Sequence, residues 1–478
     1  MKSNKLQDAI SMIDSDLVMN AESRRRKSHT YHLKWTMPVA AVLALVIGLT
    51  VFIGFGGNNS GVLYAYAVSL PEYPTMSQYP KNMLDTSYND KYEAWRDSVD
   101  AQNEYRGAGV NLDSYIKNTV SEFLSVSSGE NAVYSPLNIY MALAMLAETT
   151  DGTTRQQILD LLCAEDIDSL RTQAHAIWNA NYRNDGLSSC TLASSVWIDD
   201  KLNYNSKITD LLSEYYYASS YYGDMSSKDY GEAYKQWLKE QTGGLLDNYI
   251  TDSQFPPETI IALATTVYFQ AQWSDKFKKS DTSEGVFHTE TDDIACDFMH
   301  RTDQSKAYYY GEKFSAVCQE LQGSGNMCFI LPDEGVSVSE LIKNEETLSF
   351  ITSPKDEWNK CKYMKINMSL PKFDVSSNTD LTASIKRLGI TDCFSMERAD
   401  FSPLIENDNV FLSGINHGAR VSVDEEGVTG SAYTEMFLAG GAMPLEDEID
   451  FVLDRPFLFV ITGTDSLPVF IGVVNNPV

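Results

Sequence analysis

The chain contains the residue types of hydrolytic chemistry, but their spacing does not form a nucleophilic site. Residues 321–327 read LQGSGNM, which lacks the G-x-S-x-G spacing that presents a serine on a sharp turn. Ser402, in the segment ADFSPL, has no histidine near it in the sequence to act as a base. The sequence therefore disfavours a cell-surface hydrolase, and we predict that the protein is not an enzyme and has no catalytic residue.

The seven cysteines and six histidines are scattered along the chain. No two cysteines have the CxxC spacing of zinc and redox sites, and their odd number does not indicate a disulfide framework. We therefore predict no metal site and no cofactor. Cys318 and Cys328 flank a turn signal at 323–325 and could face each other across a hairpin, but we favour buried free thiols that behave as small hydrophobic side chains.

An unusual charge pattern occurs in residues 425–448, EEGVTGSAYTEMFLAGGAMPLEDE. The nineteen residues from Gly427 to Leu445 carry a single charge. Alternate residues form one uncharged and mostly small side: Val428, Gly430, Ala432, Thr434, Met436 and Leu438. The other side holds the charge: Thr429, Ser431, Tyr433, Glu435 and Phe437. This alternation is typical of a half-buried strand, but four glycines, at 427, 430, 440 and 441, would weaken one. We predict a segment that can form a strand without being committed to it.

The formal net charge of −29 excludes one class of partner. Residues 1–36 have more basic than acidic side chains, and no basic patch follows them. A strongly acidic surface repels phosphate backbones, so we predict that the protein does not bind nucleic acid.

Residues 37–57 contain no charge, and twenty-one residues at helical rise match the ~30 Å hydrocarbon core of a bilayer. The basic run RRRK, at 24–27, precedes them. By the positive-inside rule we predict a cytoplasmic tail at 1–36, a transmembrane anchor at 37–57 and an extracytoplasmic remainder. The alternative is a secreted protein whose signal is cleaved at 65–67. Residues 58–110 are predicted to be a spacer between the membrane and the next domain.

From about residue 111 onward, helical and strand patterns alternate without the regular repeat of βα units. Residues 112–124 have the apolar spacing of a helix, 140–148 are typical of a buried helix, and 259–269 of a buried strand. Two hairpins are indicated, at 316–332 and at 451–474, the second turning at 463–466. We predict a single α+β domain over 111–478 with large antiparallel sheets.

Over this range the chain resembles the serpin family in eight motifs that occur in the family's order. They are NAVYSPLNIYMALAMLAETTDGTTRQQI, WLKEQTGGLL, VYFQAQWSDKF, LPKFDV, LGITDCF, ADFSPL, INHGARVSVDEEG and RPFLF. One such match would be weak, whereas eight in order are specific. The resemblance implies a serpin fold, with three β-sheets, eight or nine helices and an exposed reactive loop.

The resemblance also implies a hydrogen-bonded cluster that controls the opening of the central sheet. Its members here are Ser135, Asn138, Thr265 and His417. Asn138 stands where the family usually has serine, and Thr265 where it usually has asparagine. Because threonine is shorter and lacks the amide donor, we expect the energetics of sheet opening to differ.

By resemblance, residues 425 to about 445 are the reactive loop, a bait that becomes an inserted strand once it is cleaved. The hinge of this loop is Glu425, Glu426, Gly427, Val428, Thr429, Gly430, Ser431, Ala432, Tyr433 and Thr434. The family's spacing places the cleaved bond between Gly441 and Ala442, with neighbouring bonds left open. The scissile region is Leu438, Ala439, Gly440, Gly441, Ala442 and Met443. Val428 replaces the usual threonine or serine, and Tyr433 is bulkier than the usual alanine.

The implied activity is inhibition of serine proteases, and also of cysteine proteases as a further class, through a covalent acyl complex trapped by insertion of the loop. We expect the inhibitor to be a monomer. No Arg or Lys occurs between Val421 and Asp454, so elastase-like or subtilisin-like targets are favoured over trypsin-like ones.

Two alternatives stay open. A non-inhibitory serpin, acting as a cell-surface binding or chaperone-like protein, would be marked by charged or bulky inward residues in the hinge, and the sequence has none there. A structural, wall-attached adhesin would fit the acidic composition but leaves the hinge pattern unexplained.

Overall fold

We describe the protein from a computed structural model that covers residues 63–107, 109, 111–124, 129–243, 255, 259–405, 410–428 and 447–478. All the described residues belong to one compact unit, Asn59–Val478.

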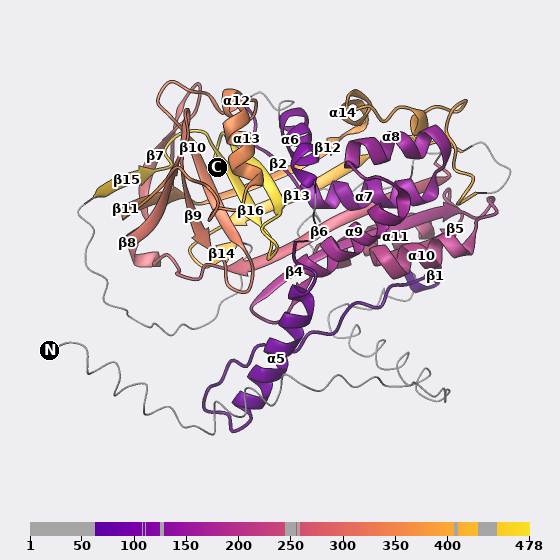
Figure 1. Cartoon of the computed structure of the whole chain (residues 1–478), viewed down its shortest axis with the longest axis horizontal. Helices are drawn as coiled ribbons and strands as arrows, with labels where there is room; N and C mark the ends of the chain where they lie inside the picture. Colours follow the sequence, from indigo (N-terminus) through magenta and orange to yellow (C-terminus); the bar gives the residue numbers. More distant parts are fainter. Residues whose placement is uncertain are drawn as a thin grey trace, which may run out of the picture. The chain divides into compact units, whose positions relative to one another are not determined.

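One sheet has eight strands and includes Gly427 and Val428, which begin the segment that the sequence singled out (Figure 1). In spatial order its path is β1 (Ala67–Ser69), β5 (Ala218–Gly223), β4 (Ser188–Asp199), β6 (Ile261–Gln272), β14 (Gly427–Val428), β13 (Asn416–Val423) and β12 (Phe373–Asp380), with β3 (Arg183–Asn184) paired to β4. The pairing is antiparallel except between β4 and β5, which are parallel. The predicted buried strand at 259–269 is β6.

The second sheet has nine strands. Its path is β15 (Glu448–Val452), β11 (Cys361–Pro371), β8 (Asp293–Tyr310), β9 (Phe314–Glu320), β10 (Asn326–Pro332), β16 (Phe457–Thr462), β17 (Pro468–Val474) and β2 (Ala132–Tyr134), with β7 (Ser283–His288) paired to β8. The long strand β8 pairs with β7 at its start and with β9 at its end. The described strands therefore form two sheets rather than the predicted three, because β8 joins strands that would otherwise belong to separate sheets. Both predicted hairpins, β9–β10 and β16–β17, are confirmed.

Ten α-helices occur in the described part of the chain. They are α5 (Tyr88–Asn103), α6 (Leu112–Phe123), α7 (Pro136–Thr149), α8 (Gly152–Leu162), α9 (Ile167–Asn181), α10 (Ser206–Tyr216), α11 (Lys228–Gln241), α12 (Val338–Leu341), α13 (Glu345–Thr352) and α14 (Thr382–Arg387). Every residue of α7 except Ala142 is buried, because this helix contacts β4, β6 and β17. An apolar surface on all sides is what such a position requires, and the predicted helices at 112–124 and 140–148 are confirmed.

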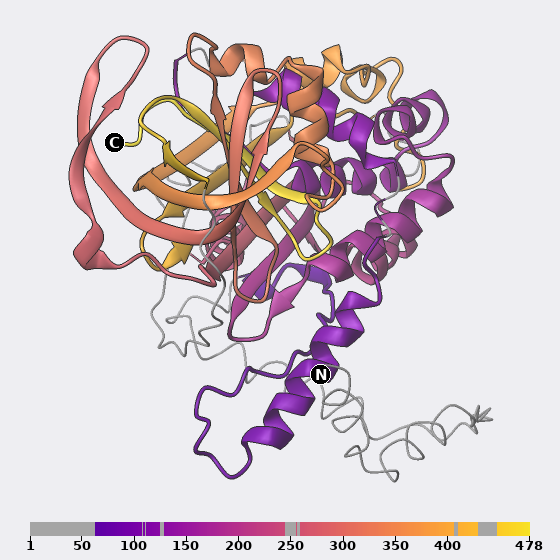
Figure 2. The same ribbon diagram turned by 60° about the vertical axis from the view of Figure 1, so that its left-hand side comes forward.

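The segment predicted as a spacer is part of the fold over residues 63–107. Strand β1 adds to the edge of the eight-stranded sheet, with Ala67 opposite Tyr221. The ring of Tyr73 stacks on Trp178 with centroids 5.4 Å apart. Helix α5 extends away from the strands, as the indigo part of Figure 2 shows. This segment therefore belongs to the same compact unit as the main domain.

The predicted localisation needs correction. No helix in the described ranges is both long enough and apolar enough to cross a membrane. The longest of them, α5, has 16 residues, which at 1.5 Å per residue reach ~24 Å and fall short of a ~30 Å hydrocarbon core. The predicted anchor, 37–57, lies outside the described residues, and the single-pass topology with an extracytoplasmic domain is not retained.

Candidate functional site

The eight-stranded sheet is joined at its centre by a strand of only two residues. Gly427 and Val428 of β14 pair with Gln272 and Ala271 of β6. On the other side Val428 pairs with Val423 of β13. Among the described strands, β6 and β13 are neighbours only through β14. The first two residues of the segment Gly427–Leu445 therefore already occupy a strand position inside the sheet.

Close approach of the backbone explains why a glycine begins this strand. A Cβ at residue 427 would lie 2.3 Å from the carbonyl oxygen of Ala271 and 2.6 Å from the Cα of Gln272. Gly427 also has a φ of +157°, which side chains disfavour. The next residue has room, and the side chain of Val428 is 1% exposed.

Glu425, two positions before β14, has a buried carboxylate that contacts side chains distant from it in the sequence. The hydroxyl of Thr282 donates to it at 2.8 Å, and Nζ of Lys372 lies 3.3 Å away. Its backbone carbonyl accepts from the backbone N–H of Phe277 at 3.2 Å. Burial alone raises the pKa of Glu425, but hydrogen bonds to the carboxylate from its own backbone N–H, from Thr282 and from Lys372, together with the charge of Lys372, outweigh burial and lower it. Glu425 is therefore ionised at neutral pH and fixed in place.

Glu426 and Trp273 complete this anchor. Glu426 lies 2.9 Å from Nζ of Lys276 and 3.6 Å from Nζ of Lys279, and the hydrogen bond from Lys276 lowers its pKa. The indole of Trp273 donates to the carbonyl of Asp424 at 2.8 Å, and its backbone N–H donates to the carbonyl of Glu426 at 3.1 Å. Charged residues are thus held at the entrance to the sheet, and uncharged ones follow inside it.

The far end of the uncharged segment is held in the other sheet. Strand β15 begins at Glu448 and runs parallel to β11, with Glu448 opposite Lys365. Nζ of Lys365 lies 2.8 Å from this carboxylate, and their hydrogen bond lowers the pKa of Glu448. The backbone N–H of Lys365 also donates to the carbonyl of Asp447 at 2.9 Å. The segment between β14 and β15 therefore connects two different sheets.

Two of the four residues predicted for the sheet-opening cluster, Ser135 and His417, are joined by a hydrogen bond. Ser135 caps α7 by accepting from the backbone N–H of Asn138 at 3.2 Å. Nε2 of His417, on β13, accepts from the backbone N–H of Ser135 at 3.1 Å. Burial lowers the pKa of His417 to about 4, so the ring is neutral and Nε2 is free to accept. This bond links helix α7 to β13.

The other two cluster positions behave differently. The side chain of Asn138 is fully buried, and within the described residues neither its Nδ2 nor its Oδ1 has a hydrogen-bond partner. Thr265 lies on β6 opposite Ser194 of β4 and is half-buried. In the part of the chain that the structure describes, no hydrogen bond joins Thr265 to the other three residues. The cluster is therefore incomplete at the two positions that depart from the family's usual residues.

Comparison with known proteins decides the family. The family model described as "Serpin (serine protease inhibitor)" matches residues 117–477, more than half of the chain. The chain belongs to the serpin family. It is 30% identical to Serpin-ZX of Arabidopsis thaliana over 403 residues, which cover 80% of this chain and 99% of that protein. It is 28% identical to the leukocyte elastase inhibitor of Homo sapiens, with coverage of 74% and 96%.

Solved structures agree with this assignment. The native state of tengpin, a thermophilic serpin, superposes with a TM-score of 0.66 at 26% identity, covering 76% of this chain and 94% of tengpin. The predicted α+β serpin fold is confirmed. Nine of the ten described helices, α6 to α14, follow residue 111, in agreement with the expected eight or nine.

The predicted loop residues divide at Val428. Glu425, Glu426, Gly427 and Val428 are placed as described above. The remaining hinge positions, Thr429 to Thr434, and the whole scissile region, Leu438 to Met443, lie outside the described residues. Their roles in this serpin stay predictions.

Sequence reasoning missed the partners of the hinge. Lys372 and Trp273 lie in motifs that identified the family, but their contacts with Glu425 and Asp424 were not foreseen. Thr282 lies in none of the eight motifs. The available signal was the pair of carboxylates beside an apolar segment, since such groups need cationic partners when they are buried. Spacing along the chain does not reveal which lysines supply them.

The expectation for two cysteines was wrong. Cys318 and Cys328 form a disulfide, whereas the other five cysteines are free. The two residues are direct partners across the β9–β10 hairpin, so their side chains lie on the same face of the sheet. Two free thiols and a disulfide have the same sequence pattern here, and the pairing is decided by the register of the hairpin.

Proposed function

We propose that this serpin inhibits serine proteases by trapping them on its reactive loop. A protease attacks the loop, the cut loop inserts between β6 and β13, and the protease is held before it completes hydrolysis. The observation that supports this most directly is β14, where Val428 is already paired with both strands and buried. Further insertion would extend an existing strand rather than create one.

The charge pattern supports extension of that strand. In a strand, side chains alternate between the two faces, so Gly430, Ala432 and Thr434 would follow Val428 into the interior. An isolated charge in that interior would cost several kcal/mol, and these residues carry none. Glu435 would fall on the opposite face. Insertion is therefore compatible with the sequence for at least four alternate positions.

In the proposed mechanism the protease supplies the groups that break the peptide bond. Its serine hydroxyl attacks the carbonyl of the residue before the cleaved bond, the peptide bond breaks, and an ester joins the two proteins. The segment after the cut carries the new amino group. Insertion of the segment before the cut releases free energy stored in the native state and displaces the protease from its reactive geometry. Inhibition then depends on insertion being faster than hydrolysis of the ester.

The favoured targets have shallow or hydrophobic specificity pockets. The loop offers leucine, alanine, glycine and methionine around the cleaved bond and no basic residue, which suits elastase-like or subtilisin-like enzymes. The similarity to the leukocyte elastase inhibitor supports this class.

The test uses the full chain, because residues 63–107 are part of the fold. It is mixed with elastase-, subtilisin-, chymotrypsin- and trypsin-like proteases, and the products are separated on a denaturing gel. We expect a denaturant-resistant complex with the first two classes and a released C-terminal peptide that begins near Ala442. Cleavage of the loop by every protease without any complex would instead favour a non-inhibitory serpin.

A matched pair of variants tests insertion itself. Thr434→Arg would place a charge in the sheet interior, and we expect it to convert the inhibitor into a substrate. Glu435→Arg places the same side chain on the outward face and should keep most of the complex yield. Equal complex yields from the two variants would contradict the insertion argument.

A further inference from the structure

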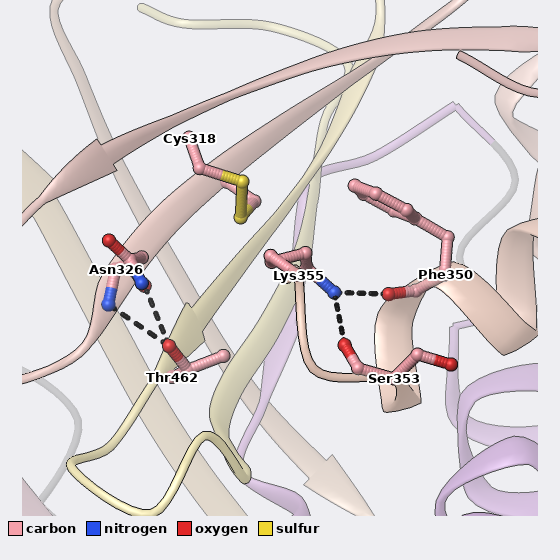
Figure 3. Close-up of a disulfide and its surroundings, with 7 residues drawn as sticks. Cys318, Asn326, Phe350, Ser353, Lys355 and Thr462 are labelled. Atoms are coloured by element: carbon pink, nitrogen blue, oxygen red, sulfur yellow. Dashed lines mark hydrogen bonds between the residues drawn. A yellow bond between two sulfur atoms is a disulfide. The ribbon is translucent and has the colours of Figure 1, made fainter. Parts of the chain in front are cut away.

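The disulfide lies in a hairpin that reaches from the nine-stranded sheet to the hinge. Cys318 and Cys328 are directly opposite each other in β9 and β10, with their Cα atoms 3.9 Å apart (Figure 3). On the outer side of β10, Asn326 is held by Thr462 of β16, whose hydroxyl accepts from its backbone N–H at 3.0 Å. The hairpin is thus also fixed to β16 of its own sheet, at the end of β10 next to the turn.

The tip of this hairpin, residues 320–325, is bonded to the end of β6 in the other sheet. The backbone N–H of Ser274 donates to the carbonyl of Glu320 at 2.9 Å, and that of Gln322 donates to the carbonyl of Gln272 at 2.8 Å. Leu321 forms a bridge with Trp273 between these two bonds. The tip also reaches β4, where the hydroxyl of Ser188 donates to the carbonyl of Gly323 at 3.0 Å. It therefore spans the end of two neighbouring strands.

The same short stretch of β6 holds the hinge. Gln272 pairs with Gly427, and the backbone N–H of Trp273 donates to Glu426. Residues 271–274 are thus bonded to the hairpin tip and to the hinge at the same time. A movement of β6 away from β13 at this end must therefore also shift the hairpin tip or break its bonds to β6.

We propose that the Cys318–Cys328 disulfide is a redox-controlled brace that holds the end of β6 and so sets the rate at which the sheet opens at the hinge. The bond fixes the hairpin directly behind its tip, so an oxidised hairpin resists the shift of β6. Once the bond is reduced, the strands can separate locally and the tip can follow β6. Opening of the sheet then becomes faster.

The reaction that switches the brace is exchange with a dithiol. The reagent's thiolate attacks one sulfur, the S–S bond breaks, and the second thiol of the reagent completes the exchange. The protein gains two electrons and two protons as two thiols, and the reagent leaves as its own disulfide. Cys318 is 7% exposed and Cys328 is fully buried, so attack at Cys318 is expected.

The test is hydrogen exchange of the backbone amides, measured by mass spectrometry on the full chain. Oxidised protein, dithiol-treated protein and the double variant Cys318→Ala/Cys328→Ala are compared at residues 271–274 and 424–428. We expect exchange to be at least ~10-fold faster in both regions when the bond is lost. Exchange in α8, remote from the hairpin in sequence, serves as the internal reference. An increase smaller than ~10-fold in either region would overturn the proposal.

Two controls make every outcome decisive. Dithiol should leave the double variant unchanged, and Cys361→Ala, which removes a partly exposed free thiol, should leave the oxidised protein unchanged. If the double variant does not fold, the reduced native protein supplies the comparison.

Hydrogen exchange needs no protease, so the brace is tested independently of the proposed function, on which only its effect on inhibition rests. Faster exchange without any protease complex would refute the inhibitor function and keep the brace. If a protease complex forms, but neither its yield nor the hydrogen-exchange rates depend on the redox state, the brace is refuted and the inhibitor function is kept.

Discussion

Replacing Asn138 by leucine is expected to stabilise the native state. The amide is fully buried in α7, and neither its Nδ2 nor its Oδ1 has a partner among the described residues. Each unsatisfied buried polar group costs about 1–3 kcal/mol, so the two together cost about 2–6 kcal/mol. Leucine has a similar branched shape without these groups, although its larger volume costs about 1–3 kcal/mol by overpacking. The expected net gain is about 2 kcal/mol.

Asn179 provides the matched control. It is also buried in a helix, α9, but its amide is satisfied, since Nδ2 donates to the carbonyl of His175 at 2.9 Å and Oδ1 accepts from Tyr217 at 3.1 Å. Asn179→Leu has the same change in helix propensity and volume. It should destabilise the protein by about 2–6 kcal/mol, because the hydroxyl of Tyr217 loses its partner and the added volume also costs about 1–3 kcal/mol.

The assay is equilibrium unfolding in urea, with the midpoint and the slope compared among the three proteins. Asn138→Leu should raise the midpoint, and Asn179→Leu should lower it. If both variants lower the midpoint by the same amount, the amide of Asn138 contributes like a satisfied one and the reasoning is refuted. In the proposed mechanism the same variant should also trap less protease, since the free energy stored in the native state is reduced.

Three further predictions concern the same region. Burial lowers the pKa of His417 from its usual value near 6.5 to about 4. The free energy of unfolding that depends on the neutral ring is therefore fully present above pH 6.5 and is lost as the pH falls toward 4. The loss should amount to about 3 kcal/mol in urea titrations at different pH values and be absent in His417→Gln. Glu425→Gln should cost about 1–3 kcal/mol at pH 7, because the ion pair with Lys372 is lost, and the two proteins should converge in acid as the lowered pKa of Glu425 is crossed. Ser135→Ala should cost about 1 kcal/mol of unfolding free energy, since the N-cap of α7 is lost, and an unchanged urea midpoint would contradict this role.

Periodicity was sufficient for long elements and insufficient for short ones. Helix α7 and strand β6 were predictable, because a buried helix and a buried strand carry long apolar runs. Strand β1 has three residues, Ala67–Ser69, and its pairing with β5 depends on a neighbour more than 150 positions away. No local pattern records such a partner. The family and its fold were predictable from the eight motifs, but not from periodicity alone.

The candidate site was predictable in its outline but not in its energetics. The alternation after Gly427 and the cluster positions followed from the sequence and its resemblance. The missing partners of Asn138 and the disulfide of the β9–β10 hairpin did not, because both depend on which atoms meet in space. Substitutions at motif positions are visible in a sequence, whereas the cost of an unsatisfied group is visible only in its surroundings.

The placement of charge explains where the proposed insertion would begin and what would stay behind. At the near end, Glu425 and Glu426 are fixed by lysines at the entrance of the sheet, and the ladder starts at the next residue. At the far end, Glu448 is fixed by Lys365 on a different sheet. A cut between these two anchors frees the near segment to extend β14 while the far segment remains on β11. The two carboxylate–lysine anchors therefore mark the limits of the segment that can insert, because the inward-facing residues after Gly427 are uncharged and can enter the sheet without burying an unpaired charge.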